Sequence, residues 1–289
     1  MPLYDQARPA LLACAALAGC RSIFGIDPVP VATCDQAASF GAPVELDTLA
    51  TPTGEGEPRL SSDELTIYYD VHTSFGAEIY AATRATTADA FGGAIPLDAV
   101  NTIDGIPVST NWPAPTPDGL ALYFTITSHG TQIFRATRAS THASFGAPAP
   151  VGSNTDVTVY VAADDALYLA STTRGGSNTN FALYRAELAA DGSYGDVVPL
   201  PGFDPMADDR APAVTADEQT LYYCHFDAVC SVWLAARTDP DAAWSAGQPL
   251  GASAPGDQAP GWVSPDGCRL YIRQAGSDAI DHLYVLQKP

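Results

Sequence analysis

The chain contains few basic residues and few charges of either sign. Lysine and arginine together number 13, against 33 aspartates and glutamates, so the formal net charge is −20. Because binding to a nucleic-acid backbone needs a basic surface, this composition excludes nucleic acid as a partner. Only 16% of the 289 residues are charged and 46% are hydrophobic, a balance typical of a globular chain rather than a disordered one.

The motifs of several enzyme classes are also absent. There is no Gly-x-Gly-x-x-Gly, no phosphate loop, no His-Glu-x-x-His and no Gly-x-Ser-x-Gly. The segment Cys224–Cys230, which contains His225 and Asp227, offers metal-ligand residue types, but in an exported chain we interpret it as a disulfide loop. We therefore assign no catalytic residue, no metal and no cofactor.

Helical periodicity is absent beyond the N-terminal run, and a short phrase recurs instead. An Asp-centred turn is followed by an apolar and aromatic strand in five copies: SSDELTIYY (61–69), TPDGLALYF (116–124), AADDALYLA (162–170), TADEQTLYY (215–223) and SPDGCRLYI (264–272). The turn aspartates are 55, 46, 53 and 49 residues apart. A period near 50 with about four strands per unit is typical of a β-propeller. Since these aspartates recur at the same place, we interpret them as turn caps rather than as a calcium or catalytic site.

A second phrase follows each of the first four copies, as in EIYAATRATTADAFGGAIPL from Glu78 and SVWLAARTDPDAAWSAGQPL from Ser231. It predicts an alternating strand, a loop and a short strand that ends in Pro-Leu or Pro-Val. Each blade then has four strands, the first just before the Asp turn, around residues 59–61 or 212–215. The third copy departs from the others, with a short turn at 164–166 and Glu187 in place of the arginine.

The fifth copy ends after HLYVLQKP (282–289), and its missing strand is found near the start of the chain. There, SFGAPVEL (39–46) matches SFGAPAPV (144–151). We therefore predict an all-β, five-bladed propeller over residues 39–289, with four antiparallel strands per blade and an N-terminal strand completing the last blade. Such closure hides the sheet edges that an open array would expose.

The repeat phrases carry a family resemblance. The Ser/Thr-Pro-Asp-Gly…Leu-Tyr phrase resembles the WD-like propeller repeat of TolB-type periplasmic proteins, and the Ile-Tyr-x-Ala-Thr-Arg…Phe-Gly-Ala-Pro phrase is similar to repeats of exported proteins of that family. The resemblance covers nearly everything after residue 38. It implies the propeller fold but little about activity, because propellers host unrelated functions.

The N-terminus has the features of a targeting segment. Arg8 precedes an apolar stretch, 9–18, that is too short to span a bilayer, and Leu17-Ala18-Gly19-Cys20 resembles the bacterial lipobox. The resemblance implies a signal peptide at 1–19, lipidation of Cys20, a tether at 20–38 and a place in the bacterial cell envelope, facing the periplasm or the cell surface. The membrane would be reached through the lipid anchor alone. A plain secretory signal and a cytosolic start are the alternatives.

Four cysteines remain once Cys14 and Cys20 are set aside. An even number in an exported chain favours disulfides. Cys224 and Cys230 flank a predicted hairpin tip, so we pair them. We also pair Cys34, just before the closing strand, with Cys268 in the blade which that strand joins. Free buried thiols are the alternative.

Candidate ligand-binding residues lie at or just before the first strand of each repeat, the strand nearest the propeller axis. They include acids, amides, arginines and a tryptophan: Glu55, Arg59, Asn111, Trp112, Asp156, Asp209, Arg210, Asp257 and Gln258. We expect them to ring the mouth of the central channel, where polar groups from several blades would form a concave site. The alternative is that they are solvated loop residues.

The sequence thus favours a non-catalytic, monomeric envelope lipoprotein whose propeller binds a protein, a peptide or a glycan. One alternative is a glycan-processing hydrolase or lyase, in which two carboxylates among Glu55, Asp156, Asp209 and Asp257 would flank the sugar bond. Another is an architectural protein whose channel mouth is filled by the loop at 47–56.

Overall fold

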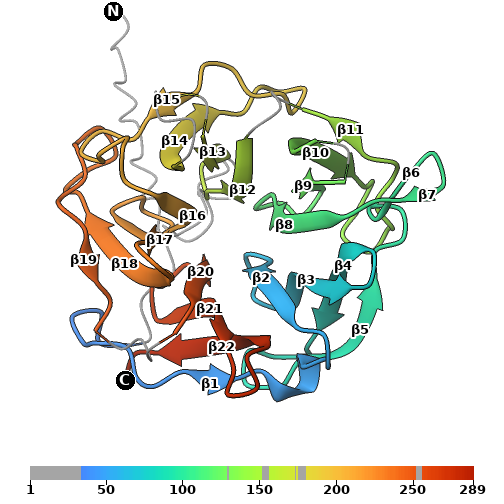
Figure 1. The fold of residues 1–289 in the computed structure, drawn as a ribbon, viewed down its shortest axis with the longest axis horizontal. Coiled ribbons are helices and arrows are strands. Elements are labelled where there is room, and N and C mark those ends of the chain that lie inside the picture. Colours follow the sequence, from blue (N-terminus) through green and yellow to red (C-terminus); the bar gives the residue numbers. More distant parts are fainter. Residues whose placement is uncertain (1–33, 129, 152–155, 173, 175–179, 252–255) are drawn as a thin grey trace, which may run out of the picture.

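The chain forms a ring of five sheets around a central axis (Figure 1). The computed structural model describes residues 34–128, 130–151, 156–172, 174, 180–251 and 256–289. Each of the five sheets has four antiparallel strands, so the predicted five-bladed β-propeller is confirmed. The predicted signal peptide, Cys20 and the predicted tether up to residue 33 lie outside the described residues.

Each blade is built in chain order from the axis outward, except that β1 closes blade 5. The innermost strands of blades 1 to 5 are β2 (Glu55–Leu60), β8 (Thr110–Pro115), β12 (Asp156–Val161), β16 (Asp209–Val214) and β20 (Gln258–Val263). The second strands are β3 (Thr66–Thr73), β9 (Ala121–Ile126), β13 (Ala166–Ser171), β17 (Thr220–Phe226) and β21 (Arg269–Ala275). The third strands are β4 (Gly76–Thr83), β10 (Gln132–Thr137), β14 (Ala182–Glu187), β18 (Cys230–Ala236) and β22 (Asp281–Gln287). The outer strands are β5 (Gly92–Pro96), β11 (Ala149–Pro150), β15 (Val198–Pro199), β19 (Gln248–Pro249) and β1 (Val44–Glu45). A short 3-10 helix, η1 (Asp47–Leu49), and a hairpin of β6 (Thr102–Ile103) and β7 (Ile106–Pro107) lie outside this plan.

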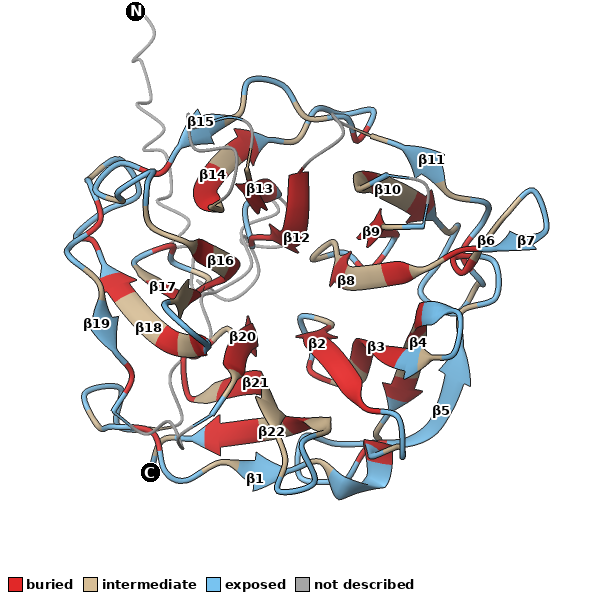
Figure 2. Ribbon diagram, viewed as in Figure 1, coloured by how far each residue is buried: buried red, intermediate tan, exposed pale blue. Residues whose placement is uncertain are grey.

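Burial decreases from the axis to the rim (Figure 2). Every residue of β2, β12 and β20 is buried, whereas every residue of β5, β11 and β15 is exposed. The core therefore lies between the faces of neighbouring blades, where the apolar and aromatic second strands pack. This packing explains why the strands of the Leu-Tyr-Tyr type are the most apolar segments of each repeat.

The innermost strands share an irregularity near their middle. In blades 1 to 4 the third residue of the strand has a left-handed backbone, with φ of 46° at Glu57, 53° at Trp112, 49° at Thr158 and 49° at Ala211. The pairing register shifts at the same point in each of them. A left-handed non-glycine residue costs about 1–3 kcal/mol. Because the strain recurs in four blades, we attribute it to the fold: a bulge bends and twists each strand so that five of them fit around one axis.

The innermost strands begin earlier than the sequence predicted. The first strand of blade 1 was expected around residues 59–61 but begins at Glu55, and that of blade 4 begins at Asp209 rather than at 212. The sequence did not reveal the first half of these strands, because Pro58 and Pro212 interrupt the alternating pattern that identifies a strand. Prolines are tolerated here because the innermost strand is an edge of its sheet.

The ring closes as predicted, with β1 pairing antiparallel to β22 through Val44 opposite Val285. The two disulfides have the predicted pairing: Cys34 is bonded to Cys268, and Cys224 to Cys230. Phe40, just before β1, packs edge-on against Tyr222 of blade 4, with ring centroids 6.0 Å apart. The N-terminal end of the described chain is therefore held by a strand pair, a covalent bond and a ring contact.

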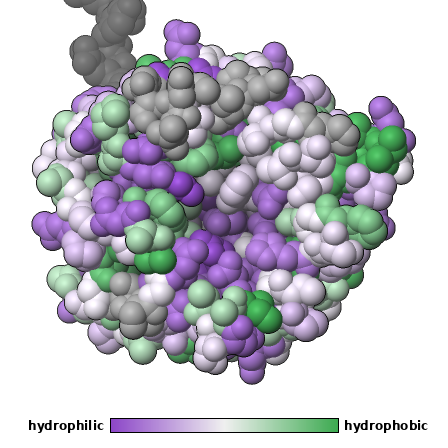
Figure 3. All heavy atoms as spheres, viewed as in Figure 1, coloured by the Kyte–Doolittle hydropathy of each residue, from purple (hydrophilic) through white to green (hydrophobic). Residues whose placement is uncertain are grey.

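The ring has two distinct faces. The entrance face is the one where the innermost strands begin, at residues such as Glu55 and Asp209, and the Asp-turn face is the one where they run into the repeated turns. Figure 3 shows the entrance face, with hydrophilic residues gathered around the hollow at its centre. At the Asp-turn end, by contrast, the axis holds a hollow of about 70 Å³ that is lined mainly by apolar side chains, among them Leu60, Tyr160 and Trp262.

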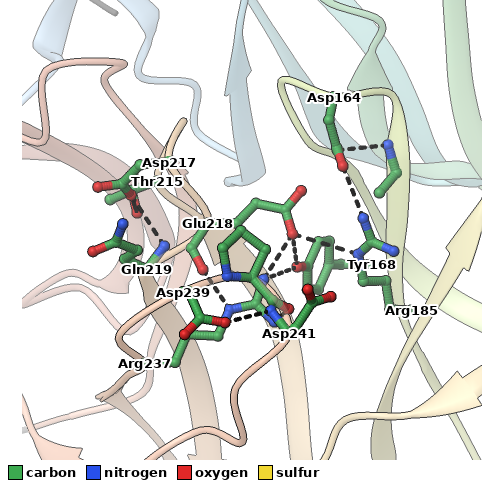
Figure 4. Close-up of polar contacts among 12 residues, drawn as sticks. Asp164, Tyr168, Arg185, Thr215, Asp217, Glu218, Gln219, Arg237, Asp239 and Asp241 are labelled. Carbon is green, nitrogen blue, oxygen red and sulfur yellow. Dashed lines mark hydrogen bonds and ion pairs between the residues drawn. The ribbon is translucent and has the colours of Figure 1, made fainter.

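A polar clasp joins neighbouring blades at the Asp-turn face (Figure 4). Arg237 follows β18 of blade 4 and donates to the Glu218 carbonyl at 2.6 Å and to its carboxylate at 2.8 Å. The same guanidinium donates to the Tyr168 hydroxyl of blade 3 at 3.2 Å and stacks 4.3 Å above the Trp244 ring. Arg237, Glu218 and Tyr168 are all buried, so this network links blade 4 to blade 3 with little solvent screening.

Equivalent arginine–tyrosine clasps occur at two further blade boundaries. Arg84 of blade 1 donates to Tyr271 of blade 5, and Arg138 of blade 2 donates to Tyr68 of blade 1, both at 3.1 Å. In blade 3 the residue that follows the third strand is Leu188. The sequence alignment had placed Glu187 at this position, which is off by one residue because Glu187 is still the last residue of β14.

The boundary between blades 2 and 3 therefore uses a different contact. Tyr123 of blade 2 donates to the carbonyl of Gly192 at 2.8 Å, and Arg135 of the same blade donates to the carbonyl of Asp191 at 3.2 Å. A turn that follows β14 thus replaces the missing arginine.

Candidate functional site

Five residues form what we call the axial cluster, at the channel end of blades 1, 2 and 5: Glu57, Arg59, Asp70, Trp112 and Arg273. Glu57 and Arg59 come from β2, Asp70 from the next strand of the same blade, Trp112 from β8 and Arg273 from β21. The bulge in β2 places Glu57 in a left-handed conformation, and Gly56 before it leaves room for the Asp70 carboxylate, because a Cβ there would meet Oδ2 at 2.5 Å. Local backbone geometry therefore builds the cluster.

Arg273 connects Glu57 to two acids outside the cluster, Asp257 and Asp281. Its Nε lies 3.7 Å from Glu57 Oε1, its Nη1 lies 2.7 Å from Asp281 Oδ2, and its Nη2 lies 3.4 Å from Asp257 Oδ1. These contacts raise the pKa of Arg273 against the opposing effect of burial. One guanidinium thus faces three carboxylates. With Asp70 there are four carboxyl groups in this region, against the two guanidinium groups of Arg59 and Arg273. The site is suited to neutral or cationic polar ligands.

Glu57 and Asp70 are buried carboxyl groups with altered proton affinity. Burial raises the pKa of Glu57, although Arg273 and Arg59 act in the opposite direction. Burial and the nearby Glu57 charge raise the pKa of Asp70 to about 7. The Trp112 backbone N–H, which donates to Asp70 Oδ1 at 3.4 Å, only partly offsets this effect. The pKa of Asp70 therefore lies near neutral pH, and that of Glu57 lies above its usual range. Such shifts are typical of functional sites but occur in structural networks too.

Arg59 crosses the propeller axis. Its Nη2 donates to the Val159 carbonyl of blade 3 at 3.3 Å, and its guanidinium carbon lies 5.1 Å from the centroid of the Tyr160 ring. Blades 1 and 3 are not neighbours in the ring, so the side chain must span the channel. Burial lowers the pKa of Arg59, against the pull of Glu57. Arg59 therefore separates the polar entrance from the apolar hollow at the Asp-turn end.

Polar atoms in this cluster lack protein partners. Within the part of the chain that the structure describes, Glu57 Oε2 and both Nε and Nη1 of Arg59 are buried without a hydrogen bond. An unsatisfied buried polar atom costs about 1–3 kcal/mol, and more when it is charged. Water or a ligand at the axis would satisfy these atoms, with the carboxylate as acceptor and the guanidinium as donor.

The structure separates the predicted mouth residues into two groups. Arg59 and Trp112 belong to the axial cluster, and Asp257 contacts it through Arg273. Glu55, Asp156 and Asp209 are buried and already paired: Glu55 with His282 at 3.0 Å, Asp156 with Arg174 at 2.8 Å and Asp209 with His225 at 2.7 Å. These three acids stabilise contacts within and between blades and do not meet as one site.

The remaining predicted residues are also engaged locally. Asn111 donates to Thr127 at 3.3 Å, and Gln258 donates to Gln274 across the strand pair at 2.7 Å. Arg210 forms a bidentate pair with Asp208 and lies between the rings of Phe181 and Phe226 at 4.6 and 4.5 Å. None of these side chains matches the expectation of a solvated loop residue, because the early start of the innermost strands draws them into the sheets.

Sequence reasoning missed Glu57, Asp70, Arg273 and Asp281. A usable signal existed for Asp70, which interrupts the apolar run of TIYYDVHT at a position that alternation assigns to the interior. No such signal existed for Glu57, because the bulge that turns it toward the axis breaks the alternation. Among the described residues, no three or more His, Cys, Asp or Glu side chains are grouped in a way that would hold a metal ion.

Comparison with known proteins shows the fold and leaves the activity open. No protein-family model matches the chain, and no curated protein matches it. Among solved structures, TolB from Acinetobacter baumannii is similar with a TM-score of 0.53 and 13% identity, over 92% of this chain and 66% of that one. The α-L-arabinofuranosidase PaAbf62A from Podospora anserina, in complex with cellotriose, gives a TM-score of 0.52 and 14% identity, over 88% of this chain and 98% of that one. The aldose sugar dehydrogenase from Streptomyces coelicolor, in its PQQ-bound form, gives 0.52 and 12%, over 88% and 99%.

These likenesses establish a propeller shared with proteins of different activities. The chain spans 66% of the length of the TolB protein that it matches. Among the described residues, no helix has the length and apolar character needed to cross a membrane.

Proposed function

We propose that the chain is a non-catalytic binding propeller of the bacterial cell envelope, anchored through lipid on Cys20, that holds a protein, peptide or glycan at the centre of its entrance face. The observation that carries this proposal is the set of unsatisfied buried atoms on Glu57 and Arg59 at the axis. Buried polar atoms without a hydrogen-bond partner lower the free energy of unfolding, and a polar ligand that bonds to them offsets this loss.

The chemistry of the cluster favours a glycan among the three ligand classes. A sugar hydroxyl donates to a carboxylate and accepts from a guanidinium, so one hydroxyl pair can satisfy Glu57 and Arg59 together. Trp112 is half-buried beside them and offers an aromatic surface of the kind that packs against sugar rings. The excess of carboxyl groups disfavours anionic ligands.

Binding to cell-wall oligosaccharides, measured by calorimetry with the mature chain, tests this proposal. The change Glu57→Gln removes a charge at the axis with almost no change in shape, and we expect it to weaken binding by about tenfold, or 1.4 kcal/mol. Glu187→Gln is the matched control, because Glu187 is exposed at the opposite face. Equal binding by the parent and the Glu57→Gln variant would remove the axial cluster from the site, and no binding to any glycan or peptide tested would favour the architectural alternative.

A glycan-processing hydrolase or lyase is the second candidate, and one observation supports it. Glu57 and Asp70 are two buried carboxyl groups with raised pKa, and the pKa of Asp70 near 7 suits a general acid. The carboxylates that the sequence nominated, Glu55, Asp156 and Asp209, are each held by a histidine or an arginine side chain and fit this role less well.

A turnover screen on arabinose-, xylose- and glucose-containing oligosaccharides tests the second candidate. If the chain is an enzyme, Asp70→Asn should abolish product formation while binding is retained. Turnover that survives both Asp70→Asn and Glu57→Gln would exclude this pair of carboxyl groups as the catalytic pair.

A further inference from the structure

The described chain begins at the Asp-turn face. Cys34 is bonded to Cys268, which lies in the turn between β20 and β21 of blade 5. The Gln36 side-chain amide donates to the carbonyl of Asp266 in the same turn at 2.9 Å, and the backbone N–H of Asp35 donates to the carbonyl of Pro289 at 2.9 Å. Three independent contacts therefore fix the point at which the preceding segment joins the propeller.

The axial cluster lies at the other end of the ring. Glu57 is the third residue of β2, close to the entrance, whereas the turns at Ser62 and Asp266 follow the ends of the innermost strands. An innermost strand of six residues is about 20 Å long, which sets the depth that separates the two faces. Fourteen residue steps separate Cys20 from Cys34. For comparison, a random coil of that many residues has an r.m.s. end-to-end distance of about 20 Å.

From this geometry we propose that the Asp-turn face is turned toward the lipid surface that holds the anchor, and that the entrance face, with its axial cluster, points away from the membrane. The inference rests on the lipid anchor of the proposed function. The Cys34–Cys268 disulfide restricts the orientation, because it attaches the segment that carries Cys20 to the Asp turn of blade 5 and not to the entrance face.

The contact with the membrane is a tether rather than an adhesive surface. The repeated turns place acidic side chains such as Asp63, Asp118 and Asp217 on this face, and anionic lipid headgroups repel them. The anchor alone thus holds the face toward the bilayer. It follows that the ligand reaches the propeller from the aqueous space or from the cell wall and not from the leaflet that holds the anchor.

Fluorescence quenching in vesicles tests this orientation. Lipidated full-length protein is labelled with a thiol-reactive dye at either of two sites in blade 1, Ser62→Cys in the Asp turn or Phe75→Cys in the hairpin at the entrance, where Phe75 is 88% exposed. It is then reconstituted into phosphatidylethanolamine and phosphatidylglycerol vesicles that carry a headgroup-linked nitroxide quencher. We expect quenching at residue 62 to exceed that at residue 75 by about twofold or more, since a 14-residue coil spans about the depth of the ring and is joined to the propeller at the Asp-turn face.

Two controls separate the possible failures. Mass spectrometry of the purified protein shows whether Cys20 carries acyl chains, and a Cys20→Ala variant should show no quenching at either position. An unmodified Cys20 would overturn both the anchor and this orientation. A lipidated Cys20 with equal quenching at the two sites, or with stronger quenching at residue 75, would overturn the orientation and leave the anchor in place.

Discussion

The two faces of the ring are built on different principles. At the Asp-turn face the same contact recurs: a Ser or Thr hydroxyl donates to the turn aspartate at 2.5–2.6 Å in blades 1, 2, 4 and 5. At the entrance face the first residue of each innermost strand has a different partner, for example His282 for Glu55 and Arg174 for Asp156. Repetition marks the end that stabilises the fold, and variation marks the end where a ligand site can differ from blade to blade.

The largest expected effect lies at the Asp-turn face. Arg237→Ala removes bonds to Glu218 and Tyr168 and leaves the buried Glu218 carboxylate with only the more distant Arg185 guanidinium, at 3.4 Å, as a cation. Breaking a buried pair by removing one partner costs about 3–5 kcal/mol, so the midpoint of urea unfolding should fall clearly. Ligand binding at the folded entrance face should be unchanged. A loss of less than about 1 kcal/mol would show that the clasps do not fix the blades.

An opposite and smaller effect is expected at the entrance. Because the pKa of Asp70 is raised to about 7, the folded state holds this proton more tightly than the unfolded state does. The resulting stabilisation is complete below the unfolded value near 4 and is lost as the pH rises to about 7. Asp70→Asn should therefore stabilise the protein at pH 8, by on the order of 1–3 kcal/mol, and have little effect at pH 4.

Urea unfolding at several pH values measures this effect, with Asp104→Asn as the control because Asp104 is an exposed residue between β6 and β7. An unchanged pH profile in Asp70→Asn would mean that Asp70 is ionised at neutral pH, and the second candidate function would lose its general acid.

The smallest effect is expected where the clasp is missing. Leu188 is a partly buried apolar residue at the arginine position of blade 3, and Tyr123 there already donates to a backbone carbonyl instead. Leu188→Ala should cost about 1 kcal/mol, because it removes part of an apolar contact and no buried charge pair. If its unfolding midpoint fell as far as that of Arg237→Ala, the boundary between blades 2 and 3 would be as strongly clasped as the others.

The fold could be predicted almost completely because each blade corresponds to one sequence repeat. Five copies of the Asp turn give the blade number, and the match between the segment at 39–46 and the segment at 144–151 gives the closing strand. The innermost strands were placed too late, since proline and a left-handed bulge residue break the alternation that identifies a strand. The two disulfide pairs followed from where their cysteines fall in the repeats.

The candidate site could be predicted only in part. Position in the repeat led to Arg59 and Trp112, which lie at the axis, and equally to Glu55 and Asp209, which are paired within the sheets. A residue's position in the repeat predicts where it lies along the propeller axis, but not whether its side chain points toward the axis or into the sheet. A single bulge turns Glu57 inward and changes that direction for its neighbours.

The sequence by itself determined the ring, its number of blades and its closure, because these depend on a period and a pattern that each repeat carries locally. Only the tertiary structure decided which polar side chains meet. Glu57, Asp70, Trp112 and Arg273 come from three blades, and their contacts depend on the backbone bulges and on the narrow radius of a five-membered ring. Contacts between segments that are far apart in the chain cannot be predicted from the sequence of any one repeat, so only the tertiary structure reveals them.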